Sequence, residues 1–313
     1  MAIIGGGILG VELAAALCDK GLAVTLVHRS ARLLTRQLDD QAAVYLRCEL
    51  ESRGIVVKLN AHLAGIQGLE RPQRIRLSTG EHIDVGMVVF ATGIHPRIEL
   101  ARQSGLHCEV GIKVDEFMRT NIPDIYAIGE CAEYQNAMVG TTDGAQAHAQ
   151  ALAEYLRGNS YAPCRIPVPA AVVKIPGFQL AAAGEVMPAS AETDVITFDD
   201  PRRRLYQKCL IYQDRLVGVI TVGDSSRFAE YHNLIQRGTE LEHLRDTLLR
   251  PGAAGKQLSG RMICSCNQVD EQTIKDAGKI NADPAAIAKS TKAGTSCGSC
   301  RPEIKRILAG LNP

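Results

Sequence analysis

Four cysteines near the C-terminus stand in two pairs, Cys264 with Cys266 in ICSC and Cys297 with Cys300 in CGSC. Four thiolates in a C-x-C and a C-x-x-C pair are a ligand set for a [2Fe–2S] cluster. Sulfur also binds zinc, but structural zinc sites usually place at least two residues between paired ligands, and C-x-C does not. The spacing therefore predicts an iron–sulfur centre, with zinc as the alternative.

The overall composition limits the class of protein. The chain has 313 residues, of which 46% are hydrophobic and 22% are charged, as in a globular protein of about two domains. The net charge of +1 provides no field that attracts nucleic acid or an anionic membrane. No run reaches the roughly 18 apolar residues of a spanning helix, and no signal peptide precedes the chain's first strand. We expect a cytoplasmic protein that binds neither nucleic acid nor a membrane.

A glycine-rich turn near the N-terminus gives a second chemical signal. The apolar run AIIGGG is followed by ILGVELAAALCDKG at helical spacing and then by LAVTLV, a pattern that predicts strand, helix and strand. Gly5, Gly7 and Gly10 fit G-x-G-x-x-G, in which the first glycine makes the turn, the second admits a pyrophosphate and the third lets helix pack on strand. We predict a dinucleotide site whose phosphates face the helix N-terminus.

The residues after the second strand concern the choice between NADH and NADPH. An acidic residue usually binds the ribose hydroxyls there, about twenty residues after the glycines. The sequence is VHRSAR instead, so no carboxylate is available. His28, Arg29 and Arg32 are candidates to pair with a 2′-phosphate, and solvated surface arginines are an equally good interpretation. The choice stays open.

Three segments resemble the pyridine-nucleotide-dependent flavoprotein reductases, in which a nicotinamide-binding domain is inserted into an FAD-binding domain. They are GGGILGVE, which is similar to the nicotinamide-side motif, and two segments similar to the return into the flavin domain, VVFATGIHPRIELARQSGL and GIKVDEFMRTNIPDIYAIGECAEY. The resemblance implies that Glu12 lies near the nicotinamide and that Gly93 binds cofactor. It also implies that Gly129 and Glu130 approach the ribityl or pyrophosphate part of FAD, although many relatives carry Asp where Glu130 stands.

The same resemblance predicts that the first half of the FAD-binding domain is missing. The family builds its FAD site from an earlier strand, glycine loop and helix, whereas this chain begins directly at the nicotinamide-side motif. We expect a fragment, which could be a trimmed chain, the product of a split gene or an incomplete reading of a longer gene.

These patterns predict an α/β chain of four parts. The parts are a Rossmann-like NAD(P)-binding domain over residues 1–92, the C-terminal part of an FAD-binding domain over 93–160, a small β-rich α+β domain over 161–250 and a small helical [2Fe–2S] domain over 258–313. The first part includes a hairpin that turns at residues 78–80 before a buried strand. The third has four strand-like runs, a hairpin bend near Asp214 and one continuous amphipathic helix over residues 227–249.

The two cysteine pairs enclose a compact helical segment. Asp270 predicts the start of one helix, and Asp283 with Pro284 predicts the start of another. Pro302 starts a third helix just after Cys300, so a helix N-terminus near the cluster would raise its reduction potential. The ligand spacing and the stretch GTSCGSCRPEIKRIL closely resemble the bacterioferritin-associated-ferredoxin-like [2Fe–2S] domain.

The combination of parts implies electron transfer. NAD(P)H gives up two electrons as hydride and a [2Fe–2S] cluster carries one, so FAD is the natural converter between them. The order of parts resembles the N-terminal half of the assimilatory NAD(P)H nitrite reductase large subunit and, equally, the electron-transfer subunit of assimilatory nitrate reductase. The resemblance implies delivery of electrons to a nitrite or nitrate reductase catalytic subunit or domain. In such reductases the third domain provides dimer contacts, which allows a homodimer.

Two other functions remain open from the sequence. A reductase of the same fold can serve a different acceptor, such as a ferredoxin or a rubredoxin. A sensor or scaffold module would bind NAD(P)H and a cluster without turnover and would need no flavin. Hydrolysis and phosphoryl transfer have no residue-level support, because no nucleophile, base and orienting group stand at a convincing spacing.

Overall fold

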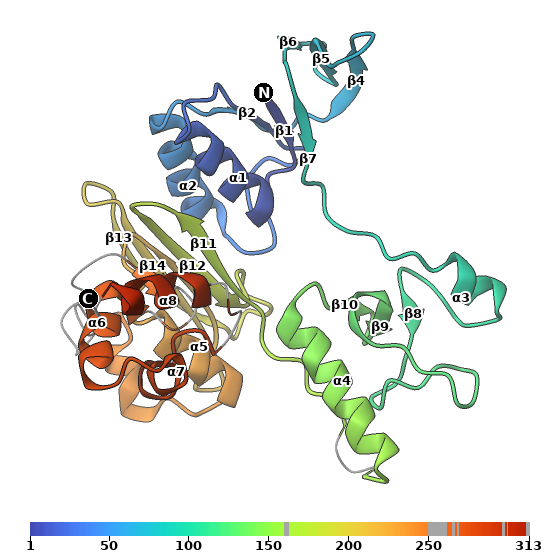
Figure 1. The fold of residues 1–313 in the computed structure, drawn as a ribbon, viewed down its shortest axis with the longest axis vertical. Helices are drawn as coiled ribbons and strands as arrows, with labels where there is room; N and C mark the ends of the chain where they lie inside the picture. Colours follow the sequence, from blue (N-terminus) through green and yellow to red (C-terminus); the bar gives the residue numbers. More distant parts are fainter. Residues whose placement is uncertain are drawn as a thin grey trace. The chain divides into compact units, whose positions relative to one another are not determined.

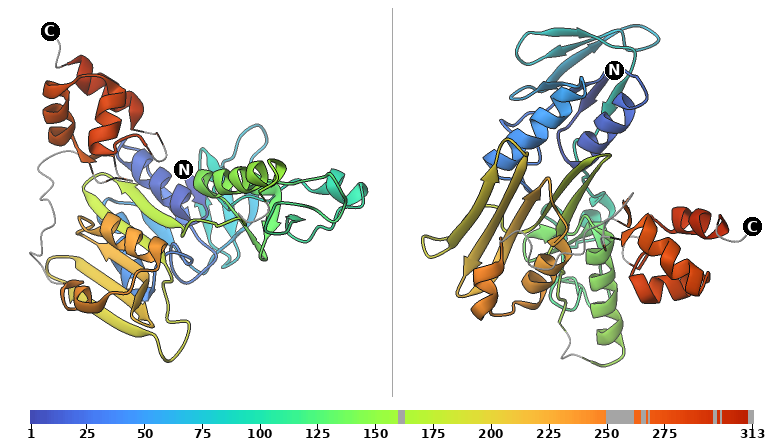
Figure 2. Two further views of the ribbon diagram at one scale, coloured as in Figure 1. Left: turned by 90° about the horizontal axis from the view of Figure 1, so that it is seen from below. Right: turned by 90° about the vertical axis from the view of Figure 1, so that its left-hand side faces the viewer.

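The computed structural model describes residues 1–159, 163–249, 262–264, 267, 269–295, 298 and 300–310. Figure 1 labels the helices and strands, and Figure 2 shows them from two further sides. The chain divides into two compact units, one made of Met1–Gly93 with Ala170–Pro313 and the other of Ile94–Pro169. Two of the predicted cluster ligands, Cys266 and Cys297, lie outside the described residues.

The first domain is built on a four-stranded parallel sheet in the order β3-β2-β1-β7. Side chains alternate across a strand, so Ile3 and Leu26 pack in one cluster with the helices while Ile4 and Val27 belong to a cluster on the opposite side. This strand–helix–strand arrangement confirms the predicted Rossmann-like domain. Its elements are β1 (Ala2–Ile4), α1 (Ile8–Cys18), β2 (Thr25–Val27), α2 (Asp40–Ser52), β3 (Val56–Lys58) and β7 (Val88–Phe90).

A three-stranded antiparallel sheet covers the side of the parallel sheet opposite α1 and α2. It consists of β4 (Leu63–Gln67), β5 (Arg74–Leu77) and β6 (His82–Asp84). The last two strands form the predicted hairpin, which is closed by a hydrogen bond from the Leu77 N–H to the Glu81 carbonyl at 2.9 Å. The following strand, β7, was predicted to be buried, and this is wrong. Phe90 is 60% exposed, because β7 is the last strand of its sheet.

The third domain is a five-stranded antiparallel sheet in the order β11-β12-β15-β14-β13. Gln213 and Asp214 both have positive φ between β14 and β15, as a two-residue hairpin turn requires, which confirms the bend predicted near Asp214. The predicted continuous helix is wrong, because α5 ends at Gly238 in the left-handed conformation and a separate 3₁₀ turn follows. The elements are β11 (Ala170–Ile175), β12 (Phe178–Gly184), β13 (Asp194–Asp200), β14 (Leu205–Tyr212), β15 (Arg215–Val222), α5 (Phe228–Arg237) and η2 (Glu242–Thr247).

The first and third domains share a hydrophobic core. Ile175, Leu180 and Val222 of the third domain lie in the same buried cluster as Val11 of α1 and Leu46 of α2. Residues that bury apolar surface against each other in this way are held together by the hydrophobic effect. Helices α1 and α2 are therefore packed against the sheet of the third domain as well as against their own sheet.

The second unit, Ile94–Pro169, is a small mixed module. The buried carboxylate of Glu133 accepts the Gly111 N–H at 2.9 Å and pairs with Lys113 at 2.8 Å, which joins two neighbouring strands. Its elements are α3 (Glu99–Gln103), β8 (Ile112–Lys113), η1 (Gly129–Cys131), β9 (Ala132–Tyr134), β10 (Ala137–Met138) and α4 (Thr142–Leu156).

The last domain consists of three helices, drawn in red and orange-red in Figure 2, that follow a short hairpin. Two helices start at their predicted caps: the Asp270 carboxylate accepts the Thr273 N–H at 2.7 Å, and that of Asp283 accepts the Ala285 N–H at 3.2 Å. No helix in the described part of the chain is long and apolar enough to cross a membrane. The elements are β16 (Met262–Cys264), β17 (Val269–Asp270), α6 (Glu271–Ile280), α7 (Pro284–Thr291) and α8 (Arg301–Ala309).

Candidate functional site

The predicted dinucleotide loop has the geometry that its glycines require. Gly5 follows β1 with a φ of +120°, and a Cβ there would lie 2.2 Å from the carbonyl oxygen of Ala91. A Cβ on Gly10 would lie 1.9 Å from the carbonyl oxygen of Gly5, so α1 packs directly on the turn. A Cβ on Gly7 would have no heavy atom within 4 Å, so that side of the loop is open. The loop therefore excludes side chains where it packs and leaves room where a pyrophosphate approaches.

The N-terminus of α1 is available to an anion. Gly7 is its N-cap, none of the described side chains accepts a hydrogen bond from its first turn, and that turn contains no acidic residue. The free N–H groups of a first turn form the positive end of the helix dipole. With the open side of Gly7, this arrangement fits the diphosphate of a nicotinamide dinucleotide.

The candidates for the ribose side of the nucleotide differ in environment. His28 lies against the loop, where its Nδ1 accepts the Gly6 N–H at 3.1 Å. Burial, helped by the Arg29 guanidinium and opposed by the Arg32 carbonyl, lowers the pKa of His28 and so favours its neutral form. Arg32 pairs with Asp40 at 2.6 Å. Arg29 is exposed and makes no ion pair with a described residue, so it stays the predicted partner of a 2′-phosphate.

Glu12 and Gly93 lie at two different positions of the first domain. Glu12 is on α1, and its Oε1 accepts the backbone N–H of Lys174 in β11 at 2.8 Å, so the carboxylate contacts the third domain. Gly93 lies three residues beyond β7 with a φ of +101° and is exposed. A role beside the nicotinamide for Glu12 and a cofactor contact for Gly93 stay predictions.

In the second unit, Gly129 and Glu130 form the short turn η1. Gly129 has a φ of +77° and no heavy atom within 4 Å of a Cβ built on it, and the Glu130 side chain is exposed. The Gly129 N–H donates to Nδ1 of the fully buried His148 at 3.2 Å, and burial lowers the pKa of that histidine. Nε2 of His148 has no hydrogen-bond partner among the described residues. A carboxylate and an open glycine can contact the hydroxyls and phosphates of a flavin cofactor, so this turn fits one side of an FAD site.

The cysteine centre combines one residue of each predicted pair. Cys264 ends β16 and Cys300 is the N-cap of α8, and both are buried in the core of the last domain. Burial, together with the hydrogen-bonding Cys264 thiol, raises the pKa of Cys300 to about 11. Thiols buried in this way become thiolates when a metal compensates the charge. The two described thiols therefore fit a thiolate-ligated cluster, for which Cys266 and Cys297 stay the predicted further ligands.

Donor groups near the two thiols suit a negatively charged cluster. The Asn267 side-chain amide donates to the Cys264 sulfur at 3.6 Å and to the Lys292 carbonyl at 2.8 Å. Helix α8 begins at Cys300, and none of the described side chains caps it. Hydrogen bonds to sulfur and a nearby helix N-terminus both stabilise a reduced cluster. The sequence did not single out Asn267, although a side-chain amide directly after the C-x-C pair is a usable signal.

Three models of known domain families match the regions that contain these sites. Residues 1–151 match the pyridine nucleotide-disulphide oxidoreductase family, residues 169–239 the rubredoxin NAD+ reductase C-terminal domain, and residues 262–310 the BFD-like [2Fe-2S] binding domain. The chain therefore contains the reductase and cluster domains that the sequence resemblance predicts. These families imply FAD, NAD(P)H and a [2Fe–2S] cluster as cofactors.

The chain is homologous over nearly its whole length to two proteins of Bacillus subtilis. It is 32% identical to an assimilatory nitrate reductase electron transfer subunit and 32% identical to a nitrite reductase [NAD(P)H], in each case over 98% of this chain. It spans 40% and 39% of the length of these relatives. A solved NAD-dependent persulfide reductase from A. fulgidus is 26% identical, with a TM-score of 0.69 over 81% of this chain and 51% of that one.

Proposed function

We propose that the protein takes electrons from NAD(P)H, passes them through FAD to a [2Fe–2S] cluster and delivers them singly to the catalytic subunit or domain of a nitrite or nitrate reductase. One observation carries the proposal: the same chain contains an uncapped helix N-terminus behind a glycine loop and a buried thiol pair, of which Cys300 is the N-cap of another helix. The names of the two B. subtilis relatives support the choice of acceptor.

Each site has a separate task in this proposal. The loop at Gly5 and Gly7 and the N-terminus of α1 bind and orient the diphosphate of the nucleotide. FAD, when bound, would supply the conversion of a two-electron hydride donation into single-electron transfers. Cys264 and Cys300, with Cys266 and Cys297, would hold the cluster, and the Asn267 amide donates to the sulfur of Cys264. The apolar core around the two described thiols keeps water away from them.

The finer parts of the proposal rest on the family resemblance. Glu12 lies beside the nicotinamide, Gly93 contacts cofactor, and Gly129 with Glu130 binds the ribityl or pyrophosphate part of FAD. The third domain forms a homodimer contact, and the protein works in the cytoplasm. Domain boundaries near residues 92, 160 and 250 separate the NAD(P)-binding domain, the partial FAD-binding domain, the β-rich domain and the [2Fe–2S] domain.

Serine substitution of a cluster ligand tests the proposal. Cys297→Ser and Cys300→Ser each remove a thiolate, so we expect loss of the visible cluster absorbance and loss of cytochrome c reduction by NAD(P)H in the presence of added FAD. Nucleotide affinity should stay within twofold of the wild type, because the glycine loop is unchanged. Cys48→Ser, at an exposed cysteine outside both pairs, is the matched control and should keep both properties. Wild-type cytochrome c reduction by a variant without cluster absorbance would contradict the proposal.

A further inference from the structure

The third domain buries an ion pair against the start of α2. The Asp39 carboxylate accepts a hydrogen bond from the Tyr206 hydroxyl at 2.6 Å and pairs with Lys208 at 2.9 Å. Its other oxygen accepts the Ala42 N–H at 3.0 Å and so caps α2. Burial alone would raise the pKa of Asp39, but these hydrogen bonds hold it below its ordinary value. Asp39 is 6% and Lys208 7% exposed, so each charge depends on the other.

A segment held by three buried leucines connects Asp39 to the dinucleotide loop. We call residues 28–38 the strap, because they run from the end of β2 to Asp39. His28, at the first end of the strap, accepts the Gly6 N–H, and Leu34, inside the strap, donates its N–H to the Gly6 carbonyl at 2.9 Å. Three leucines of the strap, at positions 33, 34 and 38, are at most 1% exposed. The strap is therefore anchored in the core by these leucines and hydrogen-bonded to both the N–H and the carbonyl of Gly6.

The packing at Gly6 leaves the strap little freedom to move without the loop. A Cβ on Gly6 would lie 2.5 Å from Cδ2 of Leu33 and 2.8 Å from Cγ of His28. Leu34 adopts a φ of +50°, a conformation that costs a non-glycine residue free energy and persists only when its surroundings impose it. Close-packed groups of this kind transmit displacements to their neighbours.

We propose that Lys208 and Tyr206 of the third domain are positioning residues of the nucleotide site, acting through Asp39 and the strap on Gly6. This inference rests on the proposed binding of NAD(P)H by the loop. It gives the third domain a task in cofactor binding that differs from dimer contacts. Loss of the ion pair frees one end of the strap, and the N–H groups of the loop then no longer converge on the diphosphate.

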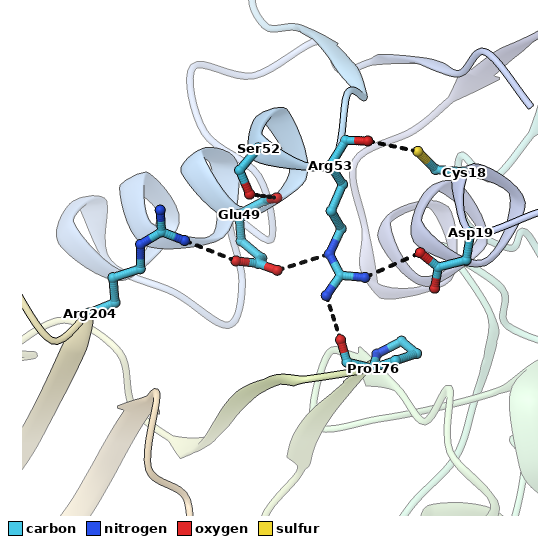
Figure 3. A network of polar contacts seen from close by, with 7 residues as sticks. All are labelled: Cys18, Asp19, Glu49, Ser52, Arg53, Pro176 and Arg204. Atoms are coloured by element: carbon cyan, nitrogen blue, oxygen red, sulfur yellow. Dashed lines mark hydrogen bonds and ion pairs between the residues drawn. The ribbon is translucent and has the colours of Figure 1, made fainter. Parts of the chain in front are cut away.

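A second set of contacts between the same two domains provides the control. Figure 3 shows it at the other end of α2, where Arg204 of the third domain pairs with Glu49 at 3.2 Å and Arg53 donates to the Pro176 carbonyl. Arg53 also pairs with Glu49 at 2.9 Å and with Asp19 at 3.3 Å. None of these contacts involves the strap. Removal of Arg204 therefore weakens the attachment of the domains without touching the path to Gly6.

The test compares nucleotide affinity in three variants of the full chain. Lys208→Met breaks the ion pair, and Asp39→Ser with Lys208→Met removes both charges while serine still caps α2. Arg204→Met is the control. Dissociation constants for NADH and NADPH are measured by calorimetric titration, with thermal unfolding and cluster absorbance as measures of folding. We expect at least tenfold weaker nucleotide binding for Lys208→Met and for the double variant, and a change below twofold for Arg204→Met.

The double variant separates positioning from stability. It leaves no unpaired buried charge, so it should unfold at a higher temperature than Lys208→Met and still bind nucleotide weakly. Wild-type affinity in the double variant, or an equal loss in Arg204→Met, would overturn the inference and leave the proposed function intact. A wild-type chain that binds neither nucleotide would overturn both. Tyr206→Phe, which removes only one hydrogen bond, should weaken binding by about two- to fivefold without a folding defect.

Discussion

In the first domain, helices α1 and α2 each follow a strand of the parallel sheet, and they differ in whether a side chain caps the helix N-terminus. After β1, the chain reaches α1 through glycines, and none of the described side chains caps the helix. After β2, the chain reaches α2 through the strap, and Asp39 caps it with a carboxylate that Lys208 and Tyr206 also bind. Each helix connects two neighbouring strands of the same sheet. Of the two, only α1 begins with first-turn N–H groups that no described side chain caps.

Between these two helices, the difference favours the N-terminus of α1 as the end that binds a ligand. A helix that only supports the fold gains about 1 kcal/mol from a side-chain cap, so the absence of a cap is a local cost. At α1 an incoming phosphate can supply the missing acceptor, whereas at α2 the chain supplies its own negative charge. Helix α8 resembles α1 in this respect, because it begins at Cys300 with no side-chain cap from the described residues. The candidate nucleotide and cluster sites thus stand at helix N-termini that no described side chain caps.

Gly7→Asp should have the largest effect, because it converts the open end of α1 into a copy of the α2 end. Gly7 has a φ of −79° and free space beyond its Cα, so aspartate fits and caps the helix. Its carboxylate would then occupy the N–H groups and repel the diphosphate. We expect at least a hundredfold loss of affinity for NADH and NADPH, about 2.7 kcal/mol, with unchanged or higher stability. Gly7→Ala is the control in a calorimetric titration, and equal affinities of Gly7→Asp and Gly7→Ala would contradict the interpretation.

Asp39→Ala makes the opposite change, because it opens the closed end of α2. It removes the cap and leaves Lys208 buried without its partner, so the free energy of unfolding should fall by about 3–5 kcal/mol. Asp283→Ala removes an exposed cap with no buried partner and should cost about 1 kcal/mol in the last domain. Urea unfolding followed by circular dichroism measures both values. Similar losses of unfolding free energy in the two variants would show that the ion pair at Asp39 adds no stability beyond that of the helix cap.

The ion pair also predicts how stability changes with pH. The pKa of Asp39 is below its ordinary value of 3.8, so its contribution is complete above pH 3.8 and is lost as the pH falls through the folded-state pKa. The free energy of unfolding should therefore fall below about pH 4 by up to about 1.4 kcal/mol per pH unit for this group. The Asp39→Ser, Lys208→Met double variant should lack this component, while the two proteins share every other carboxyl group that titrates in this pH range. Parallel curves for the two proteins would refute the assignment.

Asn267→Leu should have the smallest effect, and it addresses the other open helix end. It removes the N–H donor to the Cys264 sulfur while the N-terminus of α8 remains. The reduction potential of the cluster should become more negative by roughly 30 mV. This shift corresponds to a threefold change in the ratio of reduced to oxidised cluster, since a tenfold change in that ratio is about 59 mV for one electron. A redox titration at the visible absorbance measures the shift. An unchanged potential with an intact spectrum would exclude a role for this hydrogen bond.

Features with a local cause could be predicted from the sequence. The positive φ of Gly5 and the close approach at Gly10 follow from their spacing, and the caps Asp270 and Asp283 follow from side chains that bond within their own turn. Helix α2 was missed, although Asp39 before a periodic apolar run was an available signal. Strand β12 was missed because its run of alanines lacks the branched side chains typical of strands, and neighbouring strands supply its stability.

Contacts between distant parts of the chain could not be predicted. Asp39 and Lys208 are separated by 169 residues, and no sequence motif predicts that they form an ion pair. The contact of Glu12 with the backbone of Lys174 could not be predicted either, because nearly every residue type has a backbone N–H that can donate such a bond. Pairings of this kind arise from the packing of whole domains, which residue spacing does not encode.

The most direct test of the account is an anaerobic titration of the purified chain, with added FAD, by NADH and by NADPH at the visible absorbance of the cluster. The account predicts that the wild-type absorbance bleaches with at least one nucleotide, that Gly7→Asp bleaches far more slowly, and that dithionite bleaches both. A wild-type cluster that dithionite reduces and neither nucleotide reduces would contradict electron transfer from the glycine loop to the cysteine centre. Equal bleaching of the Gly7→Asp variant would contradict the assignment of the α1 N-terminus as the nucleotide site.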